Sequence, residues 1–242
     1  MNSSVNLLDS DTQYAVYSFR LDASNRRHPA IASECALGPP RIREAIRQTS
    51  DKRMKDTTNK NFWDHSARIY DRFMRTDAAA YDEIVRLIRT RLSPDMEVLE
   101  LATGTGLIAL QIADCVKSIE ATDFSDKMLA VARGKPAPPN VRFSRQDATR
   151  LTYPNRRFDA VVIANALHVM PHPESALSEI HRVLKDDGIL IAPTFTHKGL
   201  SFFSRIKSAI MKRFGFGVFY SWSPQEYIAF IDGHEFIVRY SR

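Results

Sequence analysis

Residues 98–106 read VLELATGTG, an apolar run that leads straight into a turn with two glycines. The apolar run predicts a short buried strand, and the residues after the glycines, as far as Ala113, predict a helix. Gly104 and Gly106 lack side chains, so the backbone can turn sharply there and approach a ligand at the carboxyl end of the strand. A tight strand-to-helix connection without a ligand gives the same pattern. The turn is therefore a candidate binding site that needs support from other residues.

The alternation of strands and helices continues along the chain. Strands are predicted over residues 118–122, 141–144, 158–164 and 189–194, and helices over residues 125–132 and 173–184, with a turn at 185–188. Ahead of the glycine turn, apolar residues spaced three and four apart predict two helices within residues 61–93. Strands that alternate with helices build a parallel sheet covered by helices. We therefore expect an α/β fold with a doubly wound, mostly parallel sheet and helices on both faces.

The composition excludes several classes of protein. The chain has 242 residues, which suits one catalytic domain with a modest extension. Its two cysteines, Cys35 and Cys115, lie in unrelated contexts, so neither a disulfide scaffold nor a metal site is expected. Residues 1–10 lack the order of a signal peptide, which favours the cytoplasm. The net charge of +6 comes without a nucleic-acid-binding motif, so a solvated basic surface is favoured over specific nucleic-acid binding.

Changes in polarity and in apolar periodicity along the chain suggest the domain organisation. Residues 1–60 are polar, with no sustained apolar period, and are expected to be a poorly ordered basic extension that the fold can lose. Residues 61–242 are then the main domain. Within it we expect amino-terminal helices over 61–93, a ligand-binding core over 95–196 and a substrate-side cover over 198–225.

Four blocks in residues 95–196 together resemble the class I S-adenosylmethionine-dependent methyltransferases. They are the segment with Glu100 and the glycine turn, the segments ATDFS (121–125) and RQDA (145–148), and a late signature over residues 158–188. Ala102 departs from the pattern, because the family most often has its first glycine there. The resemblance is closest to the type 11 group that includes ubiquinone and menaquinone methyltransferases. It implies a Rossmann-like fold and S-adenosylmethionine as the cofactor.

The resemblance also implies a set of cofactor-binding residues, in which Asp123 would accept hydrogen bonds from the ribose hydroxyls and Asp147 would contact the adenine amino group. Other roles stay open: Asp123 as a helix cap, Met128 in core packing and Tyr70 as an anchor of its helix. The full set is Tyr70, Glu100, Ala102, Thr103, Gly104, Gly106, Asp123, Phe124, Met128, Asp147, Ala148 and Asn165.

Methyl transfer is an in-line displacement, so the protein mainly positions the reactants and excludes water. Where the acceptor must lose a proton, His168 is the first candidate base, because it follows the fourth core strand at the expected mouth of the site. A structural hydrogen bond is the alternative role for His168, and His172 or His197 are substitutes. The expected acceptor is a small molecule or a lipid-like compound.

Two other functions compete with methyl transfer. The chain would be a noncatalytic S-adenosylmethionine-binding protein if it binds the cofactor without transferring methyl. It would be a nicotinamide-dependent oxidoreductase if it binds NAD, since Gly104, Gly106 and Ala109 also satisfy the dinucleotide pattern with an acid about twenty residues on. An acid at position 100 favours the cationic cofactor, because it would meet like charge beside a pyrophosphate.

Two expectations concern the last part of the chain. Residues 198–225 contain no acid and mix phenylalanines with basic residues, so they are either a substrate-side cover or a peripheral contact with an anionic membrane. Residues 235–240 resemble the family's sixth strand, and no sequence is left for the seventh, which pairs antiparallel with the sixth. We therefore expect the sheet to lack its last strand. The sequence does not indicate an oligomeric state.

Overall fold

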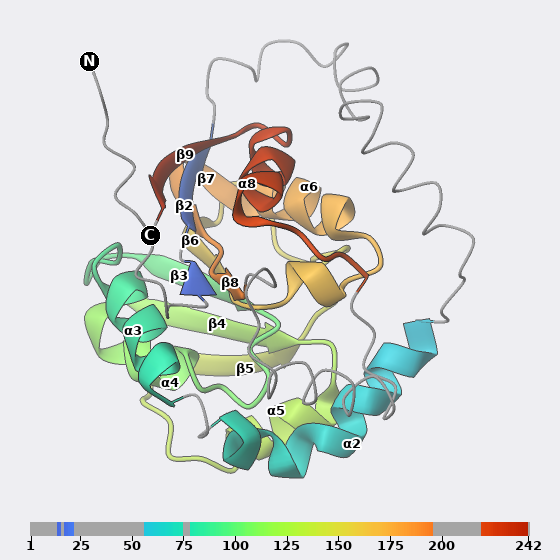
Figure 1. Cartoon of the computed structure of the whole chain (residues 1–242). Helices are drawn as coiled ribbons and strands as arrows, with labels where there is room; N and C mark the ends of the chain where they lie inside the picture. The colour runs from blue at the N-terminus through green and yellow to red at the C-terminus, as the bar shows by residue number, and fades with distance from the viewer. Residues whose placement is uncertain (1–13, 16, 22–55, 75–77, 196–218, 242) are drawn as a thin grey trace.

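A computed structural model of the chain describes residues 14–15, 17–21, 56–74, 78–195 and 219–241. Among these residues, seven strands form one sheet in the order β5-β4-β3-β6-β7-β2-β9 (Figure 1). Strands β5, β4, β3, β6 and β7 run parallel, and β2 is antiparallel to both of its neighbours. The bounds are β2 (Tyr17–Leu21), β3 (Glu97–Leu101), β4 (Ser118–Asp123), β5 (Val141–Arg145), β6 (Phe158–Ile163), β7 (Leu184–Ile191) and β9 (Phe236–Ser241).

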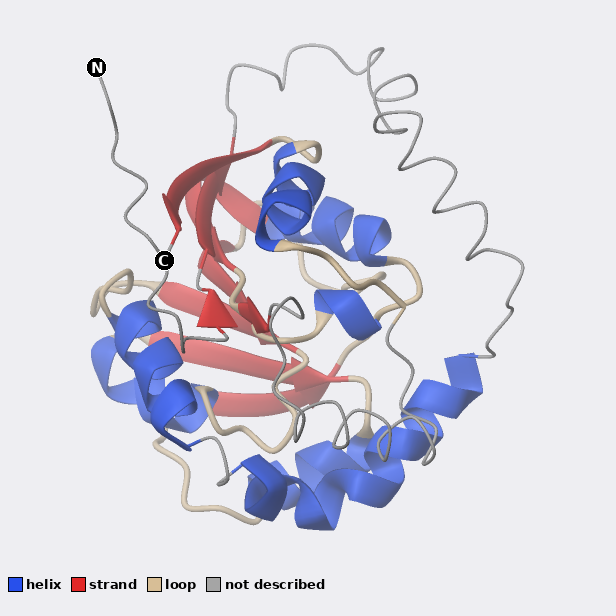
Figure 2. Cartoon of the chain, viewed as in Figure 1, coloured by secondary structure: helices blue, strands red, loops and turns tan. Residues whose placement is uncertain are grey.

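Helices cover both faces of this sheet (Figure 2). One core cluster joins Leu99 and Leu101 of β3 to buried residues of α6 and α8, and the other joins Val98 of β3 to buried residues of α3 and α4. Successive side chains of a strand point to opposite faces, so these two clusters lie on opposite sides of β3. The doubly wound fold is confirmed. The helices are α2 (Asp56–Met74), α3 (Ala78–Arg89), α4 (Ala109–Ile112), α5 (Asp126–Arg133), α6 (Pro173–Val183) and α8 (Pro224–Asp232), with 3-10 helices η3 (Ala113–Cys115) and η4 (Leu167–Val169).

Strand β2 comes from the stretch that we expected to lie outside the fold. It inserts between β7 and β9, where it pairs Ser18 with Ile191 and Tyr17 with Ser241 (Figure 1). Tyr17 and Phe19 are 2% and 0% exposed and belong to the core cluster of α6 and α8. A strand beside the sixth is thus present, so the expected loss of the last strand is wrong. The expected extension over residues 1–60 is also wrong for residues 17–21.

Two further boundaries differ from the prediction. The predicted turn at residues 185–188 lies inside β7, which begins at Leu184 and shifts register opposite Phe158 and Ala160 of β6. A second, two-stranded sheet joins β1 (Tyr14–Ala15) to β8 (Thr194–Phe195) just beyond the end of β7. Most of the predicted cover lies outside the described residues. Its last part includes Ser223, which caps α8 together with Glu226 in a capping box.

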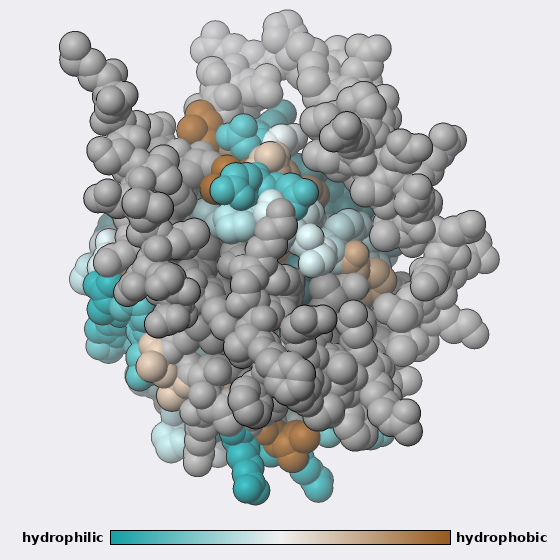
Figure 3. Space-filling model, in the orientation of Figure 1, coloured by the Kyte–Doolittle hydropathy of each residue, from teal (hydrophilic) through white to brown (hydrophobic). Residues whose placement is uncertain are grey.

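The described surface is not strongly apolar. On the face in Figure 3, hydrophobic residues form small separate patches among hydrophilic ones. The large hydrophobic side chains that are exposed are Ile69, Phe124 and Ile237. None of the described helices has the length and apolar character needed to cross a bilayer.

Candidate cofactor site

A cleft of about 270 Å³ opens at the carboxyl ends of β3, β4 and β6. The chain runs outward from β3 to β4 and β5 on one side and to β6 and β7 on the other, so the cleft lies where the strand order reverses. Open α/β sheets bind their ligands at this point. The lining residues are Trp63, Tyr70, Ala102, Gly104, Thr122, Asp123, Phe124, Ser125, Met128, Gln146, Asp147, Ala148, Thr149, Ala164, Asn165, Ala166, Val169, Met170, Pro171, His172 and Phe219.

The glycine turn contains three residues with positive φ, of which Ala102 and Gly104 line the cleft. Gly104 and Gly106 have φ of 57° and 77°, and Ala102 has φ of 53°. A Cβ on Gly106 would lie 3.0 Å from the ring of Phe143, so space as well as conformation favours glycine there. Ala102 adopts a left-handed conformation that costs an alanine energy. Ala102, which stands where the family most often has a glycine, is thus a strained residue that lines the cleft.

Asp123 at the end of β4 connects the cleft to the turn. Its carboxylate accepts hydrogen bonds from the backbone N–H of Gly104 and of Ser125, both at 2.8 Å. Burial raises the pKa of Asp123, and these backbone donors partly offset that effect. The helix cap of α5 is Ser125, whose hydroxyl accepts from the Met128 N–H, so Asp123 is not that cap. A carboxylate has about four acceptor positions, so Asp123 retains capacity for ligand hydroxyls.

An apolar wall lies beside Asp123. Phe124 is 41% exposed, which is unusual for a large aromatic side chain, and the Arg145 guanidinium lies 5.3 Å from the centre of its ring. Met128 is buried and lines the cleft, yet it belongs to neither of the two core clusters. Ala148 also lines the cleft, on the loop after β5. Together they form a surface suited to a flat, apolar ring.

Helix α2 covers the cleft with Trp63 and Tyr70, which lie seven residues apart on one face. The two rings meet edge to face with centroids 6.0 Å apart. Tyr70 contacts the turn, since its Cε1 lies 3.8 Å from the place of a Cβ on Gly104. Burial raises the pKa of Tyr70 well above its usual value. Tyr70 therefore lines the cleft and packs against the core, and its role toward a cofactor stays a prediction.

Polar contacts hold α2 in this position. The Thr105 hydroxyl donates to the Asp71 carboxylate, which also pairs with the Lys135 ammonium at 2.6 Å. Lys135 donates in turn to the Thr105 carbonyl oxygen at 2.8 Å. Seven residues earlier on the helix, Asp64 accepts a hydrogen bond from the Ser125 hydroxyl. The cover helix is thus attached both to the glycine turn and to the first turn of α5.

Glu100, Thr103 and Gly106 lie behind the lining residues and not among them. Glu100 is 2% exposed, and its Oε2 accepts a hydrogen bond from the Thr103 hydroxyl at 2.8 Å. Burial raises the pKa of Glu100 to about 8, and the Thr103 hydroxyl and Ala109 amide oppose that rise. Glu100 is therefore mostly protonated at pH 7 in the ligand-free chain, and it contacts the turn.

Asn165 follows β6 and has a left-handed backbone with φ of 53°. Its N–H donates to the Pro193 carbonyl at 2.8 Å, which orients the residue at the base of the cleft. The carboxamide interacts with the Tyr81 hydroxyl and lowers its pKa, and beyond this contact neither its nitrogen nor its oxygen has a hydrogen-bond partner among the described residues. Buried polar atoms normally have partners, so this carboxamide suits a polar ligand group.

Residues 98–188 match the family of methyltransferase domains. This part of the chain is therefore similar in sequence and in fold to methyltransferase domains. The cofactor of such domains is S-adenosylmethionine. A demethylmenaquinone methyltransferase of Renibacterium salmoninarum is 36% identical over 120 residues, which is 50% of each chain. The chain thus spans about half the length of the curated relatives it matches.

Solved structures agree with the methyltransferase assignment. A putative methyltransferase from Bacillus halodurans is 26% identical, with a TM-score of 0.54 over 63% of this chain and 68% of that one. The DhpI–SAH complex is 27% identical, with a TM-score of 0.50 over 56% of this chain and 67% of that one. The methyltransferase domain is therefore favoured over the nicotinamide alternative.

The predicted base of this methyltransferase domain does not line the cleft. His168 is 6% exposed and lies in η4, the single turn that follows β6, which carries its side chain inward. Its carbonyl oxygen accepts hydrogen bonds from the N–H groups of Phe219 and Tyr220 at 3.0 and 3.1 Å. His172 does line the cleft, with its Nδ1 3.4 Å from the Glu174 carboxylate. His197 lies outside the described residues.

Sequence reasoning missed several lining residues of the methyltransferase domain. Trp63 was detectable, because it lies two helical turns before Tyr70 on the same face. The sequence around Phe219 does not indicate a place in the cleft, because that place depends on the hydrogen bond from its N–H to the distant His168 carbonyl oxygen. The others are Thr122, Ser125, Gln146, Thr149, Ala164, Ala166, Val169, Met170 and Pro171, with His172 considered before as a base.

Proposed function

We propose that the chain transfers a methyl group from S-adenosylmethionine to an apolar, quinol-type small molecule. The observation that carries this proposal is the coincidence of the methyltransferase domain with a cleft built by its own glycine turn, Asp123, Asp147 and Asn165. The demethylmenaquinone methyltransferase of Renibacterium salmoninarum supports the acceptor class.

The residues of the cleft fit the cofactor. Asp123 has acceptor positions for the two ribose hydroxyls, and Phe124 and Met128 offer an apolar wall for adenine. Asp147 would accept from the adenine amino group, and the carboxamide of Asn165 would receive polar atoms of the amino-acid part. Among the described lining residues there are two carboxylates and neither Lys nor Arg. That balance suits a cation and disfavours the pyrophosphate of NAD.

Other lining residues of the cleft suit an apolar acceptor. They are Val169, Met170, Pro171 and Phe219, and His172 also lines the cleft. S-adenosylmethionine would supply a methyl carbon that its sulfonium activates. The apolar side chains would position the acceptor and keep water out. His172 would take the proton that the acceptor loses, in place of His168.

Calorimetric titration with S-adenosylmethionine and NAD, followed by transfer of labelled methyl, tests the proposal. We expect selective binding of S-adenosylmethionine and labelling of quinol precursors, with phospholipids and small amines as comparison acceptors. Asp123→Ala should weaken binding by about 10- to 150-fold, the value of a lost charged hydrogen bond. Binding without labelling of any acceptor would identify a noncatalytic binding protein, and tight NAD binding alone would contradict the proposal.

A further inference from the structure

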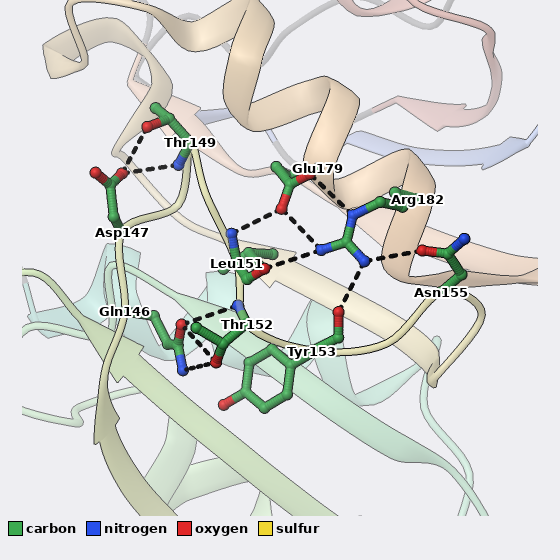
Figure 4. Close-up of polar contacts among 9 residues, drawn as sticks. All are labelled: Gln146, Asp147, Thr149, Leu151, Thr152, Tyr153, Asn155, Glu179 and Arg182. Atoms are coloured by element: carbon green, nitrogen blue, oxygen red, sulfur yellow. Dashed lines mark hydrogen bonds and ion pairs between the residues drawn. The ribbon is translucent and has the colours of Figure 1, made fainter.

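The loop after β5 carries four lining residues of the cleft, Gln146, Asp147, Ala148 and Thr149. This loop has little regular structure, so side chains hold its shape (Figure 4). Asp147 Oδ1 accepts hydrogen bonds from the Thr149 N–H at 2.9 Å and the Thr149 hydroxyl at 2.7 Å. Gln146 Nε2 donates to the Thr152 hydroxyl at 2.8 Å. These contacts shape the loop but do not attach it to the rest of the domain.

Several contacts make that attachment: the Gln146 N–H donates to the Asp123 carbonyl oxygen, Tyr153 contacts Glu120, and Leu151 is buried in the core. Arg182 of α6 makes the largest set of hydrogen bonds to the loop. Its guanidinium donates to the carbonyl oxygens of Leu151 and Tyr153 at 3.0 and 2.7 Å, and to Asn155 Oδ1 at 2.9 Å (Figure 4). Three acceptors of the loop are thus held by one rigid, planar group. A lysine cannot reproduce this, since its charge sits on a single nitrogen.

Glu179, one turn earlier on α6, completes the contact. Its carboxylate accepts from the Leu151 N–H at 2.7 Å and from Arg182 Nε and Nη2 at 2.9 and 2.8 Å. Both polar groups of the Leu151 backbone are therefore bound by this pair. The other face of α6 is firmly packed, since Ala176, Leu177 and Ile180 are each 0% exposed. The pair therefore joins the loop to a fixed part of the core.

The described part of the chain contains a second ion pair with the same spacing, on another helix. On α3, Arg86 donates to both carboxylate oxygens of Glu83 at 2.7 Å. The side chains of Arg86 and Glu83 are 54% and 43% exposed, against 30% and 20% for Arg182 and Glu179. Comparing the two pairs separates the ion pair itself from its contacts with the loop.

We infer that Glu179 and Arg182 are positioning residues that hold the loop so that Asp147 faces the purine base of the cofactor. The inference rests on the proposed function for the ligand, and it adds two residues that lie outside the cleft. It requires that the effect of Arg182 on ligand affinity passes through Asp147. A purely structural role for Arg182 would lower stability without any such coupling.

Hydrogen exchange in the ligand-free protein tests the first step. In Arg182→Lys, we expect the Leu151 amide to exchange about tenfold faster or more, because the Glu179 carboxylate that accepts from it loses its own bidentate partner. Arg86→Lys should leave exchange at Leu151 unchanged. Equal exchange in wild type and Arg182→Lys would overturn the inference, whatever the ligand.

A double-mutant cycle tests the second step, with S-adenosylhomocysteine as the probe in calorimetry. Arg182→Lys and Asp147→Ala should each weaken binding by about tenfold, and the double variant by about tenfold also, in place of the hundredfold of independent sites. Additive losses would overturn the inference. Wild type that fails to bind the probe would instead contradict the proposed function, while the exchange result still stands.

Glu179→Gln guards against a general loss of folding. Glutamine keeps an oxygen that can accept from the Leu151 N–H and from Arg182, so we expect binding within about threefold of wild type. Glu179→Ala should match Arg182→Lys in both exchange and affinity. Loss of binding in Glu179→Gln with unchanged exchange at Leu151 would contradict the mechanism.

Discussion

Glu100→Gln should make the chain more stable at neutral pH, and by an amount that depends on pH. Burial raises the pKa of Glu100 from its usual 4.5 to about 8. Each pKa unit corresponds to about 1.36 kcal/mol. Ionisation of Glu100 therefore stabilises the unfolded state relative to the folded state by about 3 kcal/mol at pH 7 and by about 5 kcal/mol above pH 8. The unfolded state is favoured because it releases the proton that the folded state keeps.

The contribution of Glu100 to stability is therefore fully present below pH 4.5 and is lost as the pH rises toward 8. Glutamine has nearly the same shape, can still accept from Thr103 and has no proton to lose. We expect the free energy of unfolding of Glu100→Gln to exceed that of wild type by a margin that grows by about 1.4 kcal/mol per pH unit between pH 5 and 8.

Urea denaturation at pH 5, 6, 7 and 8 measures this margin. Glu83→Gln is the control, because Glu83 is an exposed acid in an ordinary surface ion pair. Its margin to wild type should be small, on the order of 0.5 kcal/mol or less. Parallel pH profiles for wild type and Glu100→Gln would refute the reasoning and show that the carboxyl is ionised where it lies.

Three further predictions test other parts of the structure. Ala102→Gly should raise the free energy of unfolding by about 0.5–1 kcal/mol in urea, since the relief of a left-handed alanine outweighs the added chain entropy of glycine; a fall would show that Ala102 is not strained. Phe19→Ala should lower it by about 3–5 kcal/mol, because Phe19 is buried in the core, and a change below 1 kcal/mol would mean that β2 does not pack as described. S-adenosylhomocysteine should change the fluorescence of Trp63, which lines the cleft; the signal should survive Trp222→Phe and disappear in Trp63→Phe, and the reverse pattern would displace the site.

The central strands and the glycine turn were predictable because their signals are local. Apolar runs end just before Gly104 and at Asp123, so the end of each strand can be identified from neighbouring residues. The helix at residues 173–183 has a similar local signal, with Pro173 in its first turn. Gly104, Asp123 and Phe124 lie at or just after the ends of these strands and line the cleft, while their role toward a cofactor stays a prediction.

The rest depends on partners far away in the chain. Residues 17–21 are too short to show a period, and they form a strand because β7 and β9 supply hydrogen bonds on both sides. The choice between His168 and His172 depends on one 3-10 turn that sends the first inward. The protonation of Glu100 depends on its burial in the folded chain, which the sequence alone does not reveal.

The position of β2 has a consequence for how the chain acquires its fold. Ser18 pairs with Ile191, and Tyr17 with Ser241, so β2 is synthesised long before the two strands with which it pairs. Contacts so distant in sequence slow folding, because a very large loop must close before they form. Until β7 and β9 have been synthesised, β2 lacks the strands with which it pairs, and Tyr17 and Phe19 cannot complete their packing. This edge of the sheet therefore forms late. Completion of the sheet is therefore expected only after β9 has been synthesised, and until then the apolar residues of β2 can bind chaperones.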